Sequence, residues 1–266
     1  MNLPIWVVDA FAEGGFEGNP AAVCLAGDFP GPRLMQAIAC RNRLSETAFA
    51  VRDGADWQIR WFTPTAEVDL CGHATLATAA VIFDRTEEAG DTLRFSSRSG
   101  PLAVRREAAD LVLDFPSRPP RAAPAALAAA QAAALGVTPA SCQAAADNLF
   151  AVLSDEAAVR AVRPDEDAVA ALSREAGVTG LIVTAPGATV DFVSRYFAPA
   201  VGVPEDPVTG SAHCTLVPYW AERLGRPDLV AWQLSERGGV LRCRARGERV
   251  DVGGRTRFYL EGRITV

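Results

Sequence analysis

Two glycine turns in this 266-residue chain have the composition of an anion-binding site. Gly72-His73 precedes one apolar segment, and Gly210-Ser211 precedes another. The first amides of a helix lack intrahelical partners and carry partial positive charge, so a glycine turn leading into a helix suits a bound carboxylate. The sequence therefore offers two places that would contact one anionic ligand if they meet in a cleft between domains. The alternative is that both glycines only serve tight turns before core helices.

Proton transfer needs an acid or base, and Glu46 is the first candidate. It opens the otherwise apolar stretch 46–51, and apolar surroundings bring a carboxyl group into the range useful for proton transfer. The alternative is a glutamate at an exposed strand end, paired with Arg41 or Arg43. His73 stands where a helix should begin, so it would donate a hydrogen bond or a proton there. Its alternative is an ordinary polar residue at a helix start.

Three further polar residues accompany these turns. Asp206 precedes Pro207, where it would hold a substrate amine or hydroxyl, or simply be the aspartate of a turn. Asn19 lies in Gly18-Asn19-Pro20, which is either an ordinary turn or a means of presenting an amide to the ligand. His213 follows the second glycine turn, and we expect it to pack or to support the site. Both histidines of the chain thus lie beside the glycine turns, which favours function.

The residues around the turns occur twice. Arg60-Trp61-Phe62-Thr63-Pro64 precedes the first turn, and Arg195-Tyr196-Phe197-Ala198-Pro199 precedes the second, about half the chain later. Each copy is typical of a strand, a proline loop, a small-residue turn and an apolar helix. This pattern predicts two halves of related architecture rather than a short-period repeat.

The elements that must position these residues are mostly strands. Helices are predicted at 73–83, 211–224 and 125–135. The proline-rich segment 116–120 predicts the domain boundary, which gives domains 1–118 and 119–266. A return of the last few residues to the first domain is an alternative to this simple division. Strands are predicted at 5–11, 21–25, 47–51, 58–62, 92–95, 102–106, 110–115, 148–153, 180–184, 190–196, 232–236, 240–246, 249–252 and 257–261.

Composition narrows the class of protein. With 49% hydrophobic and 22% charged residues the chain is predicted to fold throughout, and a net charge of -6 argues against nucleic-acid binding. No apolar run reaches the roughly 20 residues of a membrane helix, so we expect a cytoplasmic protein without membrane contact. The six cysteines form no Cys-x-x-Cys pair, which predicts neither a zinc ribbon nor a dithiol redox motif.

Together, several motifs resemble the PhzF-like family of phenazine biosynthesis proteins, in order and over most of the chain. The resemblance implies an α+β fold of two pseudo-symmetric domains, each a mixed β-sheet rolled into a barrel around a central helix, as in diaminopimelate epimerase. It also implies a homodimer that isomerises a small carboxylate-bearing substrate without metal or organic cofactor, as the family does with trans-2,3-dihydro-3-hydroxyanthranilate. The motifs that carry it are 9–11 with 18–20, 45–49, 60–64, 70–75 and 205–214.

By resemblance, Glu46 is the catalytic acid and base, assisted by His73 and Asp206. Gly72, Gly210 and Ser211 would contact the substrate, with Asn19 as a further binding residue. Two alternatives remain open. One is an amino-acid epimerase or racemase that uses the thiols Cys71 and Cys214, because epimerases of this fold use two facing thiols. The other is a non-catalytic ligand-binding relative.

Overall fold

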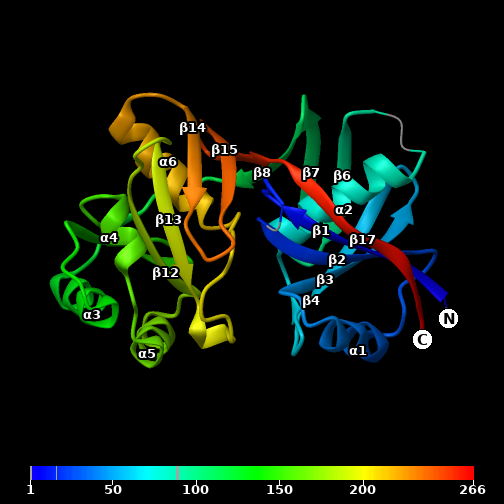
Figure 1. Ribbon diagram of the computed structural model, residues 1–266, viewed down its shortest axis with the longest axis horizontal. Helices are drawn as coiled ribbons and strands as arrows, with labels where there is room; N and C mark the ends of the chain where they lie inside the picture. The colour runs from blue at the N-terminus through cyan, green and yellow to red at the C-terminus, as the bar shows by residue number, and fades with distance from the viewer. Residues whose placement is uncertain (1, 16, 88–89) are drawn as a thin grey trace. The chain divides into compact units, whose positions relative to one another are not determined.

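A computed structural model of the chain describes residues 2–15, 17–87 and 90–266. The chain divides into two compact units, here called unit 1 (Met1–Asp114 with Gly253–Val266) and unit 2 (Phe115–Val252). The boundary between the units lies after Asp114, four residues before the boundary that the sequence predicted after Arg118. The C-terminal segment returns to unit 1 from residue 253. Figure 1 colours the chain in sequence order and labels its elements.

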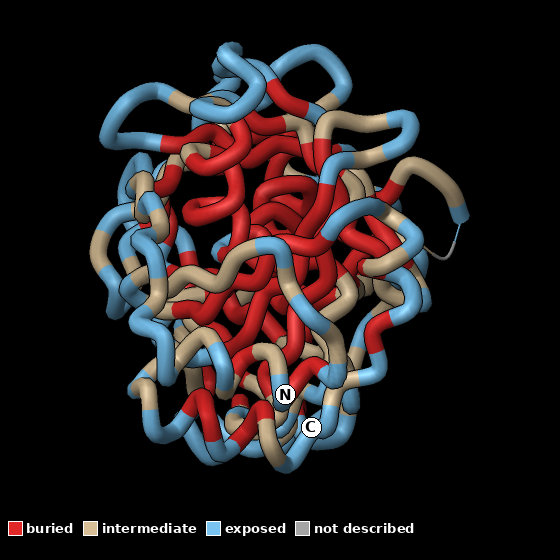
Figure 2. The backbone as a smooth tube through the Cα atoms, turned by 90° about the vertical axis from the view of Figure 1, so that its left-hand side faces the viewer, coloured by how far each residue is buried: buried red, intermediate tan, exposed pale blue. Residues whose placement is uncertain are grey.

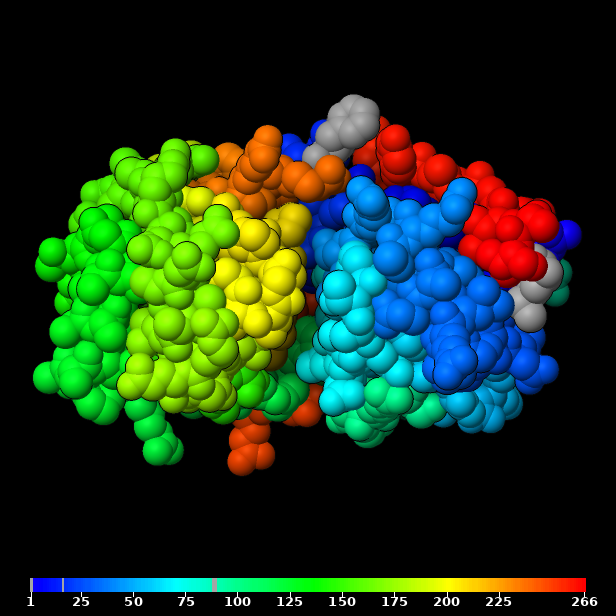
Figure 3. All heavy atoms as spheres, turned by 90° about the horizontal axis from the view of Figure 1, so that it is seen from below, coloured from blue at the N-terminus to red at the C-terminus, as the bar shows by residue number. Residues whose placement is uncertain are grey.

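Unit 1 is a mixed sheet with two helices. Its elements are β1 (Asn2–Ala10), β2 (Asn19–Ala26), α1 (Pro32–Asn42), β3 (Glu46–Asp53), β4 (Asp56–Phe62), β5 (Glu67–Val68), α2 (Gly72–Arg85), β6 (Thr92–Ser97), β7 (Gly100–Glu107), β8 (Asp110–Pro116) and β17 (Thr256–Thr265). The last strand pairs antiparallel with β1 from Thr265 opposite Asn2 to Thr256 opposite Ala10. The two ends of the chain therefore lie side by side, and red atoms of the C-terminal segment lie next to dark blue atoms of the N-terminal segment in Figure 3.

Unit 2 also contains a mixed sheet, and it has more helices than unit 1 in the part of the chain that the structure describes. Its elements are β9 (Arg121–Ala122), α3 (Ala125–Leu135), β10 (Ser141–Ala144), β11 (Asn148–Val152), α4 (Glu156–Ala161), α5 (Glu166–Ala176), β12 (Gly180–Pro186), β13 (Phe192–Phe197), the 3-10 turn η1 (Pro199–Val201), α6 (His213–Leu224), β14 (Asp228–Gln233), β15 (Gly239–Arg246) and β16 (Arg249–Gly254).

The two sheets have the same succession of strand directions. In unit 1, β1 to β2 is antiparallel, β2 to β3 parallel, β3 to β4 antiparallel, β4 to β6 parallel and β6 to β7 antiparallel. In unit 2, the strands β10, β11, β12, β13, β14 and β15 follow in the same alternation. Helix α2 connects the parallel pair β4 and β6, and α6 connects the equivalent pair β13 and β14. The predicted α+β fold of two related halves is confirmed.

Helices pack against both faces of each sheet. All residues of α2 from Gly72 to Phe83 are buried, as expected of a helix wrapped by strands, and α1 packs Met35 and Ile38 against the sheet through Phe49. In unit 2, Tyr219 and Trp220 of α6 contact Phe150 and Phe192. Figure 2 shows exposed backbone at the periphery of the view and buried backbone inside it.

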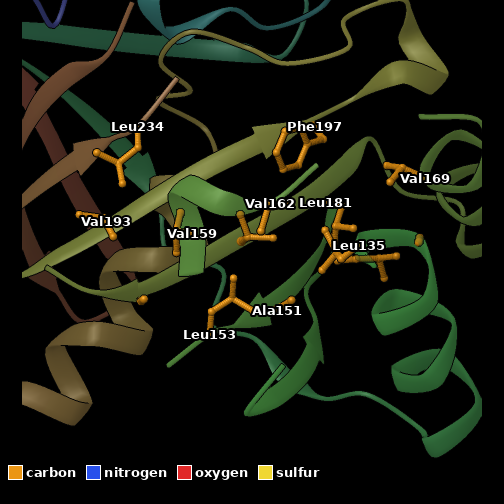
Figure 4. Close-up of a cluster of buried hydrophobic side chains, with 14 of the residues drawn as sticks. Leu135, Ala151, Leu153, Val159, Val162, Val169, Leu181, Val193, Phe197 and Leu234 are labelled. Carbon is orange, nitrogen blue, oxygen red and sulfur yellow. The ribbon is translucent and has the colours of Figure 1, made fainter. Parts of the chain in front are cut away.

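The other face of the unit 2 sheet carries helices α3, α4 and α5. Their apolar residues Leu135, Val159 and Val169 meet side chains of β11, β12 and β13, such as Leu181 and Phe197 (Figure 4). Because both faces are covered, β11 and β13 are buried at every residue, which is typical of central strands with parallel neighbours.

The structure corrects several element predictions. The helix predicted at 211–224 begins at His213, because residues 210–212 form a tight turn with bonds from the His213 amide to the Gly210 carbonyl and from Cys214 to Ser211. The strand predicted at 232–236 is β14 at Asp228–Gln233. Helices α1, α4 and α5 were absent from the prediction, although α4 and α5 carry aspartate N-caps at Asp155 and Asp165.

Within the part of the chain that the structure describes, no helix combines the length and the apolar character needed to cross a bilayer.

Candidate functional site

Parallel pairing of β2 and β3 brings the first group of polar residues together in unit 1. Ala21 lies opposite Glu46 in this register, so the beginnings of both strands share one edge of the sheet. Asn19 begins β2 and Ser45 immediately precedes β3. The Ser45 hydroxyl donates to Asn19 Oδ1 over 3.0 Å, which fixes the orientation of the Asn19 side chain.

The start of α2 faces this same edge and supplies His73. Its Nε2 lies 3.1 Å from Glu46 Oε2, and its Nδ1 lies 3.3 Å from Asn19 Nδ2. Cys71, the N-cap of α2, places its Sγ 3.5 Å from His73 Nδ1. Thus Asn19, Glu46, Cys71 and His73 converge although they come from three elements.

Burial and charge set the protonation of this group. Burial alone lowers the pKa of His73, but the adjacent Cys71 and Glu46 raise it, and the net direction is well above the ordinary value. Burial raises the pKa of the Cys71 thiol to about 11, so Cys71 is a neutral thiol near pH 7 and Glu46 is the group that stabilises the imidazolium. The Glu46 side chain is 16% exposed against 7% for His73, so the carboxylate is the open side of the pair.

The backbone beside Asn19 adopts conformations that few residues tolerate. Gly18 has φ of +80°, and a Cβ there would lie 2.4 Å from the Ala10 carbonyl oxygen, so only glycine fits. Phe11, which is fully buried, also has a positive φ of 62°. Two such conformations where β1 leads into β2 indicate a turn shaped to place Asn19, since strained backbone persists where surrounding structure holds it.

A second polar group lies in unit 2 around Asp206. The Thr209 hydroxyl donates to Asp206 Oδ2 over 2.5 Å, and the Asp206 amide donates to the Tyr196 carbonyl. Gln233, at the end of β14, binds this loop through three hydrogen bonds. Its Nε2 donates to the Asp206 carbonyl at 2.8 Å and to Thr209 Oγ1 at 3.1 Å, and its Oε1 accepts from the Thr209 amide at 2.9 Å. Gln233 is 1% exposed, so the loop is held from inside the unit.

The repeated arginine motif forms the same ion pair in both units. Arg60 contacts Glu67 through Nε at 2.7 Å and a second nitrogen at 2.8 Å, and Arg195 contacts Glu205 with the same two distances. Arg195 also donates to the carbonyls of Val159 and Val162 at the end of α4. Each arginine thereby anchors the loop between a strand and the central helix. In unit 2, Arg195 holds Glu205, the residue that precedes Asp206.

The predicted residues fall into two groups. Asn19, Glu46, Gly72 and His73 lie together in unit 1, with Gly72 as the first residue of α2. Asp206, Gly210 and Ser211 lie in the loop and turn before α6 in unit 2. The ionic partner of Glu46 is His73 and not Arg41 or Arg43. Since Gly210 and Ser211 precede α6, any anion bound there would meet turn amides rather than the first turn of the helix.

His213 belongs to the interior of unit 2. It is fully buried, its Nδ1 donates to the Thr209 carbonyl over 2.8 Å, and its ring packs 5.9 Å from that of Phe192. Burial lowers its pKa to about 4, so it is neutral near pH 7. It supports the Asp206 loop through Thr209, in agreement with a packing residue.

Sequence reasoning missed Gln233, Thr209 and Ser45 as site residues. Thr209 and Ser45 lie within motifs that it quoted, so their hydroxyls were available candidates. Gln233 had no signal, because it lies 24 residues after Thr209 and reaches the loop only through the pairing of β13 with β14.

Comparisons with known proteins find relatives that match over nearly the whole chain. The family model described as "Phenazine biosynthesis-like protein" matches residues 8–263. An uncharacterized isomerase of Pseudomonas aeruginosa is 52% identical over 264 residues, covering 99% of each chain. A PhzF-family crystal structure from Enterococcus faecalis is 46% identical with a TM-score of 0.95, covering 100% of each chain.

A more distant likeness concerns the fold alone. A hydroxyproline epimerase from Agrobacterium vitis is 10% identical with a TM-score of 0.62, covering 99% of this chain and 92% of that one. The fold is therefore shared with this epimerase, whereas the sequence similarity is to phenazine biosynthesis-like proteins. The chain belongs to the PhzC-PhzF family of phenazine biosynthesis-like proteins, an isomerase family.

Proposed function

We propose that the chain is a cofactor-independent isomerase, similar to trans-2,3-dihydro-3-hydroxyanthranilate isomerase, that moves a proton within a small carboxylate-bearing substrate bound in a cleft between the two units. The observation that carries the proposal is the contact of 3.1 Å between Glu46 Oε2 and His73 Nε2 beside the first amides of α2. The proposal is supported because an acid and base beside the start of a helix, which can bind a carboxylate, is the arrangement that such a proton transfer needs.

Glu46 removes the proton from a carbon adjacent to an activating group, and the electron pair shifts through the conjugated system. The protonated Glu46 then delivers that proton to another carbon, so the substrate gains and loses one proton and no co-reactant is needed. His73 donates a hydrogen bond to Glu46 and holds it in place. Asp206 binds a substrate amine or hydroxyl, and Asn19, Gly72, Gly210 and Ser211 contact the substrate.

The thiol alternative is less well supported. An epimerase of this fold needs a thiolate as base, but burial raises the pKa of Cys71 to about 11 and that of Cys214 to about 12. Reactive cysteines instead have lowered pKa values. Conversion of both Cys71 and Cys214 to serine should leave isomerase turnover within a few-fold of wild type, whereas an epimerase would lose it.

The test compares Glu46→Gln with wild type in deuterated solvent, with NMR following isomerisation and deuterium incorporation. We expect turnover to disappear while anthranilate affinity, measured by calorimetry, stays within a few-fold. Glu107→Gln is the matched control, because it is the same substitution at an exposed position. There Glu107 pairs only with Arg105 among the ion pairs described. Full turnover in Glu46→Gln would remove Glu46 from the mechanism.

The remaining expectations belong to the same proposal. Dialysis against a chelator should leave turnover unchanged if no metal takes part. A homodimer, cytoplasmic localisation and the absence of nucleic-acid and membrane partners stay predictions; sedimentation and cell fractionation test the first two. Loss of ligand binding in Asp206→Asn, with Glu46 intact, would support a contribution from unit 2.

A further inference from the structure

Glu46, Cys71 and His73 place three kinds of metal-ligating atom close together. One carboxylate oxygen, one sulfur and one ring nitrogen all lie within 4.8 Å of one another. His73 Nε2 is 3.1 Å from Glu46 Oε2 and 4.0 Å from Cys71 Sγ. The residues come from β3 and from the beginning of α2, and a Cys-x-His spacing does not belong to the usual zinc motifs, so sequence alone gave no indication.

The distances from His73 Nε2 to the Glu46 oxygen and to the Cys71 sulfur are close to those of ligands on a single ion. Zinc binds sulfur at about 2.3 Å, imidazole nitrogen at about 2.0 Å and carboxylate oxygen at about 2.1 Å, so tetrahedral ligands stand roughly 3.3 to 3.6 Å apart. The nitrogen-to-oxygen distance lies just below that range and the nitrogen-to-sulfur distance just above it. Small side-chain rotations that move these atoms by a few tenths of an ångström would bring both distances close to the range. Three protein ligands would leave the fourth position open, as in catalytic zinc sites.

The surroundings select the class of cation and orient the imidazole. A thiol ligand favours thiophilic ions such as Zn²⁺ over Mg²⁺ or Ca²⁺, which prefer oxygen. Asn19 is fully buried and contacts His73 Nδ1, which leaves Nε2 directed at Glu46. Glu46 supplies the entry side, since its carboxylate is the most exposed of the three side chains.

We infer that Glu46, Cys71 and His73 form a site for Zn²⁺ or a similar thiophilic divalent cation, and that occupation of this site blocks isomerisation. Binding forms bonds from the metal to Sγ, Nε2 and a Glu46 oxygen, and the thiol proton of Cys71 and the Nε2 proton of the His73 imidazolium both leave to solvent. A Glu46 oxygen that ligates the ion no longer accepts a substrate proton. Metal binding is independent of the proposed function, whereas the inhibition rests on it.

Cobalt titration of the tag-free, metal-free full chain tests the site, because Co²⁺ bound by a thiolate absorbs in the near ultraviolet and Zn²⁺ displaces it. We expect that charge-transfer band in the wild type, with one equivalent at saturation. Cys71→Ser should lose the band. Its Co²⁺ affinity should fall by at least roughly 10- to 100-fold, which is the loss seen when a residue that only hydrogen-bonds to a metal ligand is removed. A wild type without the band would overturn the site.

The matched control is Cys40→Ser, because Cys40 is the exposed thiol that adventitious cobalt would use. This variant should keep the full band; loss of the band there, or its survival in Cys71→Ser, refutes the assignment. If Cys71→Ser does not fold, Glu46→Gln serves instead, since it should keep the thiolate band and bind Co²⁺ more weakly. Unchanged affinity in Glu46→Gln would exclude the carboxylate.

Turnover separates the two proposals. If the metal-free wild type isomerises its substrate, saturating Zn²⁺ should reduce turnover at least tenfold and a chelator should restore it, and undiminished turnover would refute the inhibition. If the metal-free protein shows no turnover while the cobalt band behaves as expected, the proposed function fails and the metal site stands.

Discussion

Burial of His213 should make the stability of unit 2 depend on pH. The folded pKa is lowered from 6.5 to about 4 by burial, while the unfolded chain keeps the ordinary value. The unfolded state therefore binds more protons between these values, and stability falls as pH falls through this window. A shift of this size corresponds to about 3 kcal/mol in total, of which about 2 kcal/mol is lost by pH 5.

The perturbation is His213→Asn, because the asparagine amide can keep the donor to the Thr209 carbonyl that His213 Nδ1 provides, but does not titrate. The variant loses packing and should be less stable at every pH. Its stability should nevertheless change less than that of wild type between pH 7 and pH 5. Carboxylates with lowered pKa values, such as Glu67, also lose stabilising interactions in acid, but they are common to both proteins and cancel in the difference.

The assay is urea unfolding at both pH values, with hydrogen exchange of α6 amides to report on unit 2. We expect a double difference of about 2 kcal/mol in the free energy of unfolding. His73 does not produce the same slope, since its raised pKa moves its titration above 6.5, where stability is lost as pH rises. Equal slopes in wild type and His213→Asn would refute the reasoning.

Three further predictions concern the supports of the site. Glu205→Gln should lower the free energy of unfolding by about 3 kcal/mol, because it leaves the buried Arg195 without its charge partner. Glu67→Gln should lower it less, because Arg60 is more exposed than Arg195. Urea unfolding that ranks the two variants in the opposite order would contradict this prediction. Gln233→Leu should speed hydrogen exchange at the Thr209 amide at least tenfold, measured by NMR, and unchanged protection would deny that Gln233 holds the loop. Gly180→Ala should cost about 1 to 3 kcal/mol, since its Cβ would lie 2.6 Å from the carbonyl oxygen of Phe197; a neutral thermal melt would show that the strands relax freely.

Local patterns in the sequence were sufficient to predict the general architecture of two related halves. The repeated arginine motif predicted two related halves, and both copies form the same bidentate ion pair. The small-residue turn and apolar run predicted α2, which the sheet of unit 1 surrounds. Periodicity and turn residues suffice here because they encode local backbone conformation and which face is buried. The amphipathic helices α1 and α5 carry similar local signals but were not predicted.

Only the tertiary structure decided which side chains meet. Glu46 and His73 are 27 residues apart in sequence, and the parallel register of β2 with β3, together with the position of α2, brings them to 3.1 Å. Gln233 reaches Thr209 in the same way, through the pairing of β13 with β14. Strand register and helix packing are set by long-range burial, which no local motif contains. The sequence by itself therefore determined the kinds of residue available for chemistry, and tertiary packing determined that His73, not a neighbouring arginine, pairs with Glu46.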